Sequence, residues 1–263
     1  MGKWKVKRTE AIIIIEMSEK LAEREAYFYL EVNGHHNIIQ TLGTIENTSN
    51  LTIFIQDFAP LSDLASVLME NDPKITLTML MEMFLQITDA MCYVANKRIV
   101  HGDLGCRNVL VFELDLSQHK RNLVKITDFG LARSLNELIV VHNSSIIPKR
   151  FCAPEILQNH NSFSFYTQKS DVYSMGVLMW EALSKSEIPY SHIDDDDKVV
   201  LCKLGNEKLI RPSVCDHELW QFIESCLEYE PEWRPTFQDI EKKLGSMNIS
   251  EDSNVLRSVS SDK

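Results

Sequence analysis

The alternation of apolar and polar residues over the first 58 positions predicts strands packed with one helix. The segment Lys3–Lys7 alternates with a period of two, and runs rich in β-branched residues follow at 11–15 and 51–55. Apolar residues recur at the spacing of helical turns between Ser18 and Val32, and Asn33-Gly34 follows as a stop signal. The pattern therefore indicates a small, strand-rich unit.

After residue 60 the apolar positions mostly follow the period of helices. Helices are predicted around 77–94, 169–183, 199–204, 219–227 and 237–244, and the second of these is apolar on all sides. Two short strand-like runs lie between the first two helices, at 109–112 and 123–127. The chain is thus expected to have an α+β fold in which a larger helical unit follows the small one. Residues 246–263 are rich in Ser, Asn and Asp and are predicted to be a disordered tail.

Charge and composition exclude several classes of protein. The 263-residue chain carries 27 Lys and Arg against 38 Asp and Glu, and its net charge of −11 argues against a nucleic-acid partner. Its apolar runs fall far short of the roughly 20 residues that span a membrane, and the first residues lack the apolar core of a secretory signal. The six cysteines show no CxxC spacing, which is typical of reduced thiols. We therefore expect a cytoplasmic protein without a membrane span.

Candidate chemistry is concentrated in two polar segments near the predicted short strands. One segment, at 101–108, contains Asp103 and Asn108, and the other is Asp128-Phe-Gly130. Two carboxylates and one amide on adjacent loops suit the binding of a hard divalent cation and the orientation of a hydroxyl. Asp and Asn are also common helix caps and turn formers, which is the alternative interpretation of each position taken alone.

The order and spacing of these motifs resemble the protein kinase catalytic domain. That family's catalytic loop reads H-R-D-L-x-x-x-N and precedes D-F-G and A-P-E, which match 101–108, 128–130 and 153–155 here. Ser170–Gly176 and Arg234-Pro235 match further positions of the family. The resemblance implies a bilobal kinase fold over 1–245, with a truncated β-rich N-lobe at 1–57, a hinge at 57–61 and a helical C-lobe at 62–245. It also implies ATP and Mg²⁺ as cofactors, a protein substrate and a regulatory protein partner.

The resemblance assigns roles to the polar residues of the two loops. Asp103 would accept the proton of the attacking hydroxyl, and Asn108 and Asp128 would hold Mg²⁺. Arg107, directly before Asn108, resembles the loop of tyrosine kinases, whereas serine/threonine kinases carry a lysine at the position of Gly105. A simple surface charge is the alternative for Arg107. The segments 148–151 and 226–237 also resemble the tyrosine branch, so a tyrosine hydroxyl is the favoured acceptor.

The nucleotide site is expected at the linker between the two units. Gln56 would be the gatekeeper, the backbone at Asp57 and Ala59 would bind adenine, and Leu110 would form the floor of the pocket. A plain interlobe turn is compatible with the same linker residues.

Further matches concern residues that support the fold. Glu155 and Arg234 are expected to pair and brace the large lobe, and Asp171 is expected to anchor the backbone of the catalytic loop.

Three features depart from the family pattern. The G-x-G-x-x-G loop over the ATP phosphates is absent, and the run at 11–15 has no lysine to pair with Glu25. Glu25 is then either solvated or paired with one of the lysines of Lys3–Lys7. Gly102 replaces the arginine before the catalytic aspartate, and 128–155 contain no tyrosine, so control by loop phosphotyrosine is not expected.

Two functions follow from this mixture. The first is an ATP-dependent protein kinase of the tyrosine branch, which the retained Asp103, Asn108 and Asp128 favour. The second is a pseudokinase that acts as a scaffold or allosteric binding module, which the missing glycine loop and lysine favour.

Overall fold

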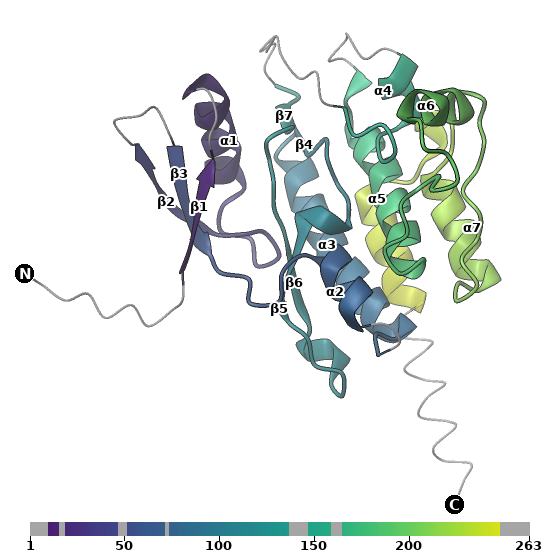
Figure 1. Cartoon of the computed structure of the whole chain (residues 1–263), viewed down its shortest axis with the longest axis horizontal. Coiled ribbons are helices and arrows are strands. Elements are labelled where there is room, and N and C mark those ends of the chain that lie inside the picture. The colour runs from purple at the N-terminus through teal and green to yellow at the C-terminus, as the bar shows by residue number, and fades with distance from the viewer. Residues whose placement is uncertain are drawn as a thin grey trace, which may run out of the picture.

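The structure is a computed structural model, and it describes residues 10–15, 19–46, 52–71, 74–136, 147–158 and 165–247. The predicted strand at Lys3–Lys7 and residues 248–263 of the predicted tail lie outside these residues, whereas residues 246–247 of that tail belong to a helix. Figure 1 shows a small sheet with one helix on one side of the molecule and a larger group of helices on the other. The expected α+β architecture with a small strand-rich lobe and a larger helical lobe is confirmed.

The small lobe contains an antiparallel sheet in the order β1-β3-β2. Its strands are β1 (Glu10–Ile15), β2 (Thr41–Glu46) and β3 (Thr52–Asp57). β1 and β3 lie where the sequence predicts strands. The hydropathy pattern does not predict β2, because its apolar residues do not alternate and a bulge between Thr41 and Gly43 shifts its register against β3. Pairing with β3 makes this segment a strand.

Helix α1 (Glu19–Val32) packs against β3, as the apolar spacing of this segment predicts. Its residues Phe28, Tyr29 and Val32 are buried, and the ring of Tyr29 lies 5.5 Å from the buried ring of Phe54. Burial of these side chains contributes about 1.5–3 kcal/mol for each large apolar group. The contact holds α1 against the sheet and so fixes the position of Glu25, one turn before Tyr29.

The large lobe is built from helices around one buried element. They are α2 (Leu64–Asn71), α3 (Leu77–Asn96), α4 (Pro154–Gln158), α5 (Gln168–Leu183), α6 (Asp196–Leu204), α7 (His217–Cys226) and a last helix at 237–247. α6 begins earlier than the apolar pattern indicates, because Asp195 caps it and accepts a hydrogen bond from the Asp197 N–H.

Helix α5 is the buried centre of this lobe. Thr167 and Ser170 form a capping box at its start, and nearly every later residue is buried, as the all-round apolar pattern predicts. Gly176 permits close packing against α7, because a Cβ at this position would lie 3.0 Å from side-chain atoms of Cys226 and Leu227. α5 therefore forms a fixed base for the loops above it.

Two small ladders place the polar loops next to each other. β4 (Ile99–Val100) pairs with β7 (Arg133–Ser134), and β5 (Val109–Glu113) pairs with β6 (Leu123–Ile126). Three 3₁₀ turns complete the described elements, η1 (Cys106–Asn108), η2 (His119–Arg121) and η4 (Pro231–Trp233). The loop at 101–108 joins β4 to β5, and the loop at 127–132 joins β6 to β7, so both loops leave the same pair of ladders.

Helix α3 is the one helix among the described residues that is long and apolar enough to cross a membrane. However, 61% of its most apolar window is buried inside the protein, as expected for a core helix. Its composition is explained by packing within the large lobe.

Candidate active site

Asp103, Arg107 and Asn108 form one hydrogen-bonded group on the loop between β4 and β5. The Asn108 side-chain amide donates to the Asp103 carbonyl at 2.6 Å and to its carboxylate Oδ2 at 3.0 Å. The Arg107 guanidinium pairs with the other carboxylate oxygen, Oδ1, at 2.6 Å. Because Asp103 is only 9% exposed, its charge is held by these two neighbours rather than by bulk water.

Helix α5 fixes the backbone of this loop from below. The carboxylate of Asp171 accepts the His101 N–H at 2.7 Å and the Gly102 N–H at 2.9 Å, and Glu181 accepts the Cys106 N–H at 2.9 Å. The anchoring expected of Asp171 is therefore present in the structure. The role of Glu181 is not apparent from the sequence. The helical pattern of α5 does not distinguish a carboxylate that binds another loop from an ordinary helix residue.

Asp128 lies beside this group through backbone contacts. The Thr127 N–H donates to the Asn108 carbonyl at 2.9 Å, and the Asp128 N–H donates to the hydroxyl of Tyr29 at 3.1 Å. Asp128 has a φ of 64°, an uncommon conformation for a residue other than glycine, although Asp adopts it more readily than most. The Tyr29 hydroxyl thus helps to hold a strained backbone, a role that sequence analysis did not detect.

A chain of packed rings connects α1 to the loop at 101–108. The Phe129 ring lies 5.4 Å from Tyr29 and 4.9 Å from His101, and His101 is bonded to Thr127 through its ring Nε2 at 3.1 Å. These rings are buried, so a shift of one displaces the next. The position of Asp128 is therefore coupled to both lobes.

Asn108 and Asp128 fit the chemistry of a magnesium site. Both hydrogen bonds of the Asn108 side chain use its Nδ2 atom, so the amide oxygen is the remaining ligand atom, and Asp128 supplies a carboxylate. No group of three or more His, Cys, Asp and Glu side chains suited to a metal occurs in the described part of the chain. Two oxygen ligands fit Mg²⁺, which usually keeps waters and takes phosphate oxygens as further ligands.

The electrostatics of Asp103 suit a proton acceptor. Burial raises the pKa of its carboxyl group, and the charges of Arg107 and His101 oppose this shift. A raised pKa increases the affinity of a carboxylate for a proton, provided that it stays ionised at working pH.

Glu25 lies next to Asp128, and no cation of the described residues acts on its charge. Burial and, second, the charge of Asp128 raise the pKa of Glu25 to about 7, while a hydrogen bond with Tyr29 opposes the shift. No Lys or Arg is among the described residues that act on its charge, and β1, with Ile13 opposite Phe54, contains no lysine. Glu25 is only 5% exposed, so the expectation of a solvated Glu25 is wrong for this side chain. The lysines at 3–7 lie outside the described residues.

Replacement of Glu25 by glutamine is expected to stabilise the protein without nucleotide by about 2 kcal/mol at pH 8, because it removes a buried charge that is also repelled by the charge of Asp128. The folded pKa is raised, so the stability linked to this group is lost as pH rises through about 7, and the gain is smaller at pH 6. Melting curves in EDTA at both pH values measure it, with exposed Glu23→Gln on the same helix as control. A lower melting temperature of the variant would instead show that Glu25 has a cationic partner.

Gly102 has a backbone conformation that explains its residue type. Its φ is 80°, and a Cβ at this position would lie 2.8 Å from the Leu131 carbonyl oxygen. The two loops therefore approach each other closely at the place where the kinase pattern has an arginine. The arginine side chain of the family pattern is therefore missing at Gly102, and the local backbone requires a glycine there.

We expect Gly102→Ala to lower the free energy of unfolding by about 1–3 kcal/mol, because any side chain must strain this backbone or displace the Leu131 carbonyl. Denaturant unfolding measures this change. Gly245→Ala is the matched control, since its Cβ would meet open space in a helix and is expected to be neutral or stabilising. Equal effects of the two substitutions would contradict the strain at Gly102.

Two of the residues predicted to bind nucleotide, Asp57 and Leu110, lie next to Lys125. The Lys125 ammonium pairs with Asp57 at 2.9 Å, and Lys125 lies opposite Leu110 in the β5–β6 ladder. Gln56 is buried, its side-chain amide donates to the Thr41 hydroxyl at 3.0 Å, and its Oε1 atom has no hydrogen-bond partner among the described residues. The backbone of Ala59 forms no hydrogen bond with other described residues. The structure thus places the linker next to the predicted pocket floor.

The two cavities described in the structure lie elsewhere, in the large lobe. One is lined by residues of α5, α6 and α7, and the other includes Arg98, Leu135 and Gln168. Neither contains Asp103, Asn108 or Asp128. We therefore identify the candidate active site by its polar side chains and not by either of these two cavities.

Glu155 and Arg234 form the expected pair. The Arg234 guanidinium binds both carboxylate oxygens of Glu155, at 2.7 and 2.8 Å, and its side chain is fully buried. The pair joins the start of α4 to the segment after η4 and so braces the large lobe.

Comparison with known proteins gives a consistent result. Residues 3–244 match the model of a family described as protein tyrosine and serine/threonine kinase. The chain is 29% identical over 246 residues to protein-tyrosine kinase 6 of Mus musculus, covering 92% of this chain and 51% of that protein. It is 31% identical over 253 residues to the tyrosine-protein kinase transforming protein Abl of Abelson murine leukemia virus, covering 94% of this chain and 32% of that protein. The chain thus spans about half the length of the first relative and less of the second.

Proposed function

The chain belongs to the protein tyrosine and serine/threonine kinase family, and on that premise we propose that it transfers the γ-phosphate of ATP to a protein hydroxyl. The observation that carries this proposal is the bonded group of Asp103, Arg107 and Asn108, with Asp128 on the adjoining loop. In this proposal the N-lobe comprises residues 1–57, the hinge 57–61 and the C-lobe 62–245, as the sequence analysis expects.

Asp103 acts on the acceptor hydroxyl in this proposal. Its Oδ1 atom is paired with Arg107 and its Oδ2 atom with Asn108, so the carboxylate is oriented before the substrate arrives. Asn108 and Asp128 would hold Mg²⁺, which when bound neutralises charge on the phosphates. Gln56, Asp57, Ala59 and Leu110 would enclose the adenine end of ATP.

A tyrosine acceptor is favoured over serine or threonine. Arg107 lies over the ring of Phe151 with its guanidinium carbon 5.3 Å from the ring centre, so the entrance to Asp103 combines an aromatic ring with a cation. Aromatic acceptors pack well against such a surface. The two relatives named above are both tyrosine kinases by name.

A second candidate is a pseudokinase that serves as a binding module, and the contact between Glu25 and Asp128 favours it. In this arrangement a carboxylate stands next to the metal ligand, where the family pattern expects a lysine–glutamate pair. Such a protein would act through a regulatory partner. In either case we propose a cytoplasmic location, which the six free cysteines support.

Phosphate incorporation from labelled ATP into poly(Glu,Tyr), compared with a serine-containing acceptor, tests the function. The proposal predicts incorporation with Mg²⁺ and a preference for the tyrosine polymer. A wild-type protein that binds Mg²⁺ and ATP but transfers no phosphate to either acceptor would favour the binding module.

A further inference from the structure

Lys203 on α6 is a buried cation, and its ammonium group donates hydrogen bonds to backbone carbonyls of one short segment, 149–152. Its residue is 1% exposed, and its ammonium donates to the carbonyl oxygens of Lys149 at 3.1 Å, Arg150 at 3.1 Å and Cys152 at 2.6 Å. An ammonium group has three N–H donors, and three carbonyls accept them. A buried charge is costly unless it is bonded in this way, so the segment and the cation stabilise each other.

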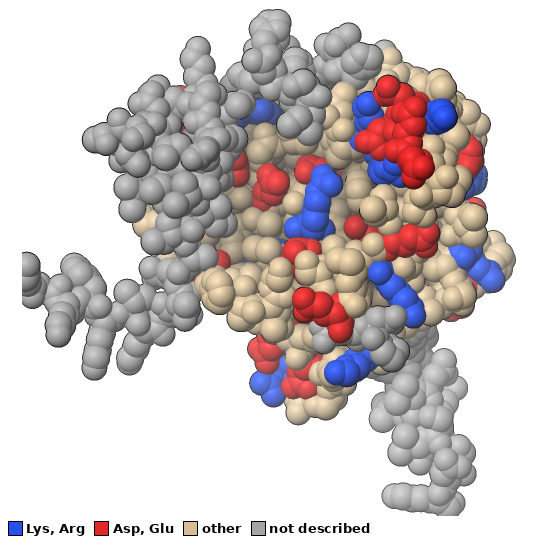
Figure 2. Space-filling model, viewed as in Figure 1, with Lys and Arg blue, Asp and Glu red and all other residues tan. Residues whose placement is uncertain are grey.

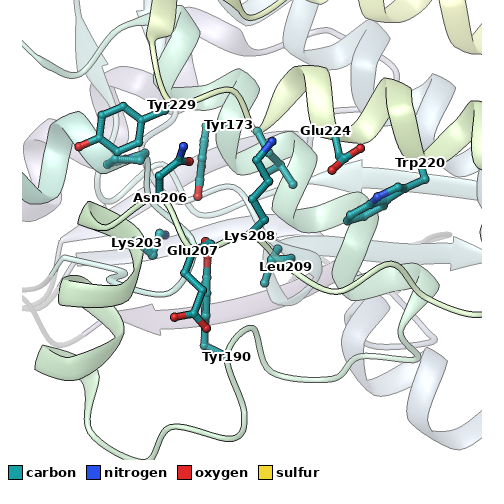
Figure 3. A pocket seen from close by; sticks show the side chains of 12 residues that line it. Tyr173, Tyr190, Lys203, Asn206, Glu207, Lys208, Leu209, Trp220, Glu224 and Tyr229 are labelled. Carbon is teal, nitrogen blue, oxygen red and sulfur yellow. Dashed lines mark hydrogen bonds between the residues drawn. The ribbon is translucent and has the colours of Figure 1, made fainter.

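Burial and nearby groups act in opposite directions on the pKa of Lys203. Burial lowers the pKa of its amine to about 8, while the neighbouring Cys152 and Glu155 oppose the shift and Arg234 adds to it. The ring of Tyr173 lies 5.1 Å from the ammonium. Figure 3 shows Lys203 near Tyr173 and Tyr190 at the edge of a cavity. This cavity leaves only about 20 Å³ for water-sized molecules, too little for an organic ligand.

Arg150 makes the reciprocal connection. Its guanidinium donates to the carbonyls of Pro189, Tyr190 and Ile193 at 2.7–3.0 Å, and it pairs with Asp196 at 2.8 Å. Each of the two cations thus binds three carbonyls of the other's segment. We call this arrangement, Lys203 and Arg150 with these six carbonyls, the double clamp.

The acidic run at 194–197 belongs to the same connection. Asp196 and Asp197 pair with Arg150 and Lys149, and Figure 2 shows acidic side chains gathered with basic ones where α6 lies. The surface ion pairs contribute little on their own. The carbonyl contacts of the double clamp, which are buried or partly buried, are the stronger link between 149–152 and 189–203.

The clamped segment touches the candidate active site. Phe151 lies below Arg107, which pairs with Asp103, and the Phe151 carbonyl accepts a hydrogen bond from Ser174 of α5 at 3.2 Å. Residues 149–151 are only partly buried, so the segment offers a surface next to Asp103. A displacement of its backbone would move Phe151 away from Arg107.

We propose that Lys203 and Arg150 are positioning residues that hold the backbone of 149–152 in the shape that binds the protein substrate beside Asp103. The inference rests on the proposed function, because it gives the segment a substrate. Lys203 and Arg150 hold the segment 149–152 through hydrogen bonds within the folded domain. In this proposal the segment therefore needs no phosphate group to order it.

The test compares Lys203→Met with the wild type, using fluorescently labelled poly(Glu,Tyr) as the acceptor. We expect the Kd and the KM for this polymer to rise at least about tenfold, while the KM for ATP stays within about twofold. Hydrogen exchange at the amides of 149–152 should become at least about tenfold faster, with α5 unchanged. Lys198→Met, an exposed lysine of the same helix, is the control and should behave as the wild type.

If Lys203→Met does not fold, Arg150→Met removes the other half of the double clamp from a side chain that is 16% exposed, and the same changes are expected. The inference is overturned if the wild type does not bind the polymer, if the variants bind it as well as the wild type does, or if the KM values for ATP and polymer rise together. A wild type that binds the polymer, loses binding in the variants and yet transfers no phosphate contradicts the proposed phosphotransfer but supports the positioning role.

Discussion

Replacement of Asp103 by asparagine is expected to lower phosphate incorporation into a tyrosine polymer at least about a hundredfold, the usual contribution of a positioned proton acceptor. The amide cannot accept the hydroxyl proton, and it also loses the charge that pairs with Arg107 at 2.6 Å. The affinity for ATP with Mg²⁺ should stay within about twofold, because Asn108 and Asp128 remain. Initial rates at saturating ATP, together with a binding titration, separate these effects.

Asp194→Asn is the control for Asp103→Asn, since Asp194 is an exposed residue of the acidic run. It should leave both rate and affinity unchanged. Full activity of Asp103→Asn would show that another residue accepts the proton, or that the measured activity belongs to a contaminant.

Arg234→Met is expected to lower the free energy of unfolding by about 3–5 kcal/mol, the usual effect of removing one partner of a buried ion pair. Besides the two bonds to Glu155, the guanidinium donates to the carbonyls of Glu228 at 2.7 Å, Lys169 at 2.9 Å and Tyr229 at 3.0 Å. Methionine fills part of the space but cannot donate any of the five hydrogen bonds that the guanidinium gives to Glu155 and these carbonyls. Chemical denaturation followed by circular dichroism measures the loss.

The exposed Arg211 provides the comparison, and Arg211→Met should change stability by less than about 0.5 kcal/mol. If Arg234→Met lowered the free energy of unfolding by no more than Arg211→Met does, the buried pair would not brace the large lobe.

The sequence was most informative where a local pattern determines the structure. The apolar spacing located α1 and α5, and the motif at 101–108 identified the group that the structure brings together as Asp103, Arg107 and Asn108. These features depend on residues within a few turns of each other, so a pattern along the chain can indicate them.

Other features depend on contacts between distant segments, which no local pattern contains. Lys203 lies in an ordinary helical pattern, yet the carbonyls that it binds are more than 50 residues away. The Tyr29 hydroxyl likewise meets the Asp128 N–H across 99 residues. At Gly102 a positive φ coincides with the close approach of the Leu131 carbonyl from another loop. Tertiary packing decides these positions, so the sequence showed the residues without their partners.

In the proposed function, Asn108 and Asp128 bind a magnesium nucleotide beside Asp103. Thermal melting of the wild type and of Asp128→Asn with ATP, in Mg²⁺ and in EDTA, tests it most directly. At a hundred times Kd a ligand stabilises the folded state by about 2.7 kcal/mol, so ATP with Mg²⁺ should clearly raise the melting temperature of the wild type. The shift should disappear in EDTA and in Asp128→Asn. A wild-type melting curve that ATP and Mg²⁺ leave unchanged, or a shift that Asp128→Asn retains in full, would contradict the binding of a magnesium nucleotide at Asn108 and Asp128.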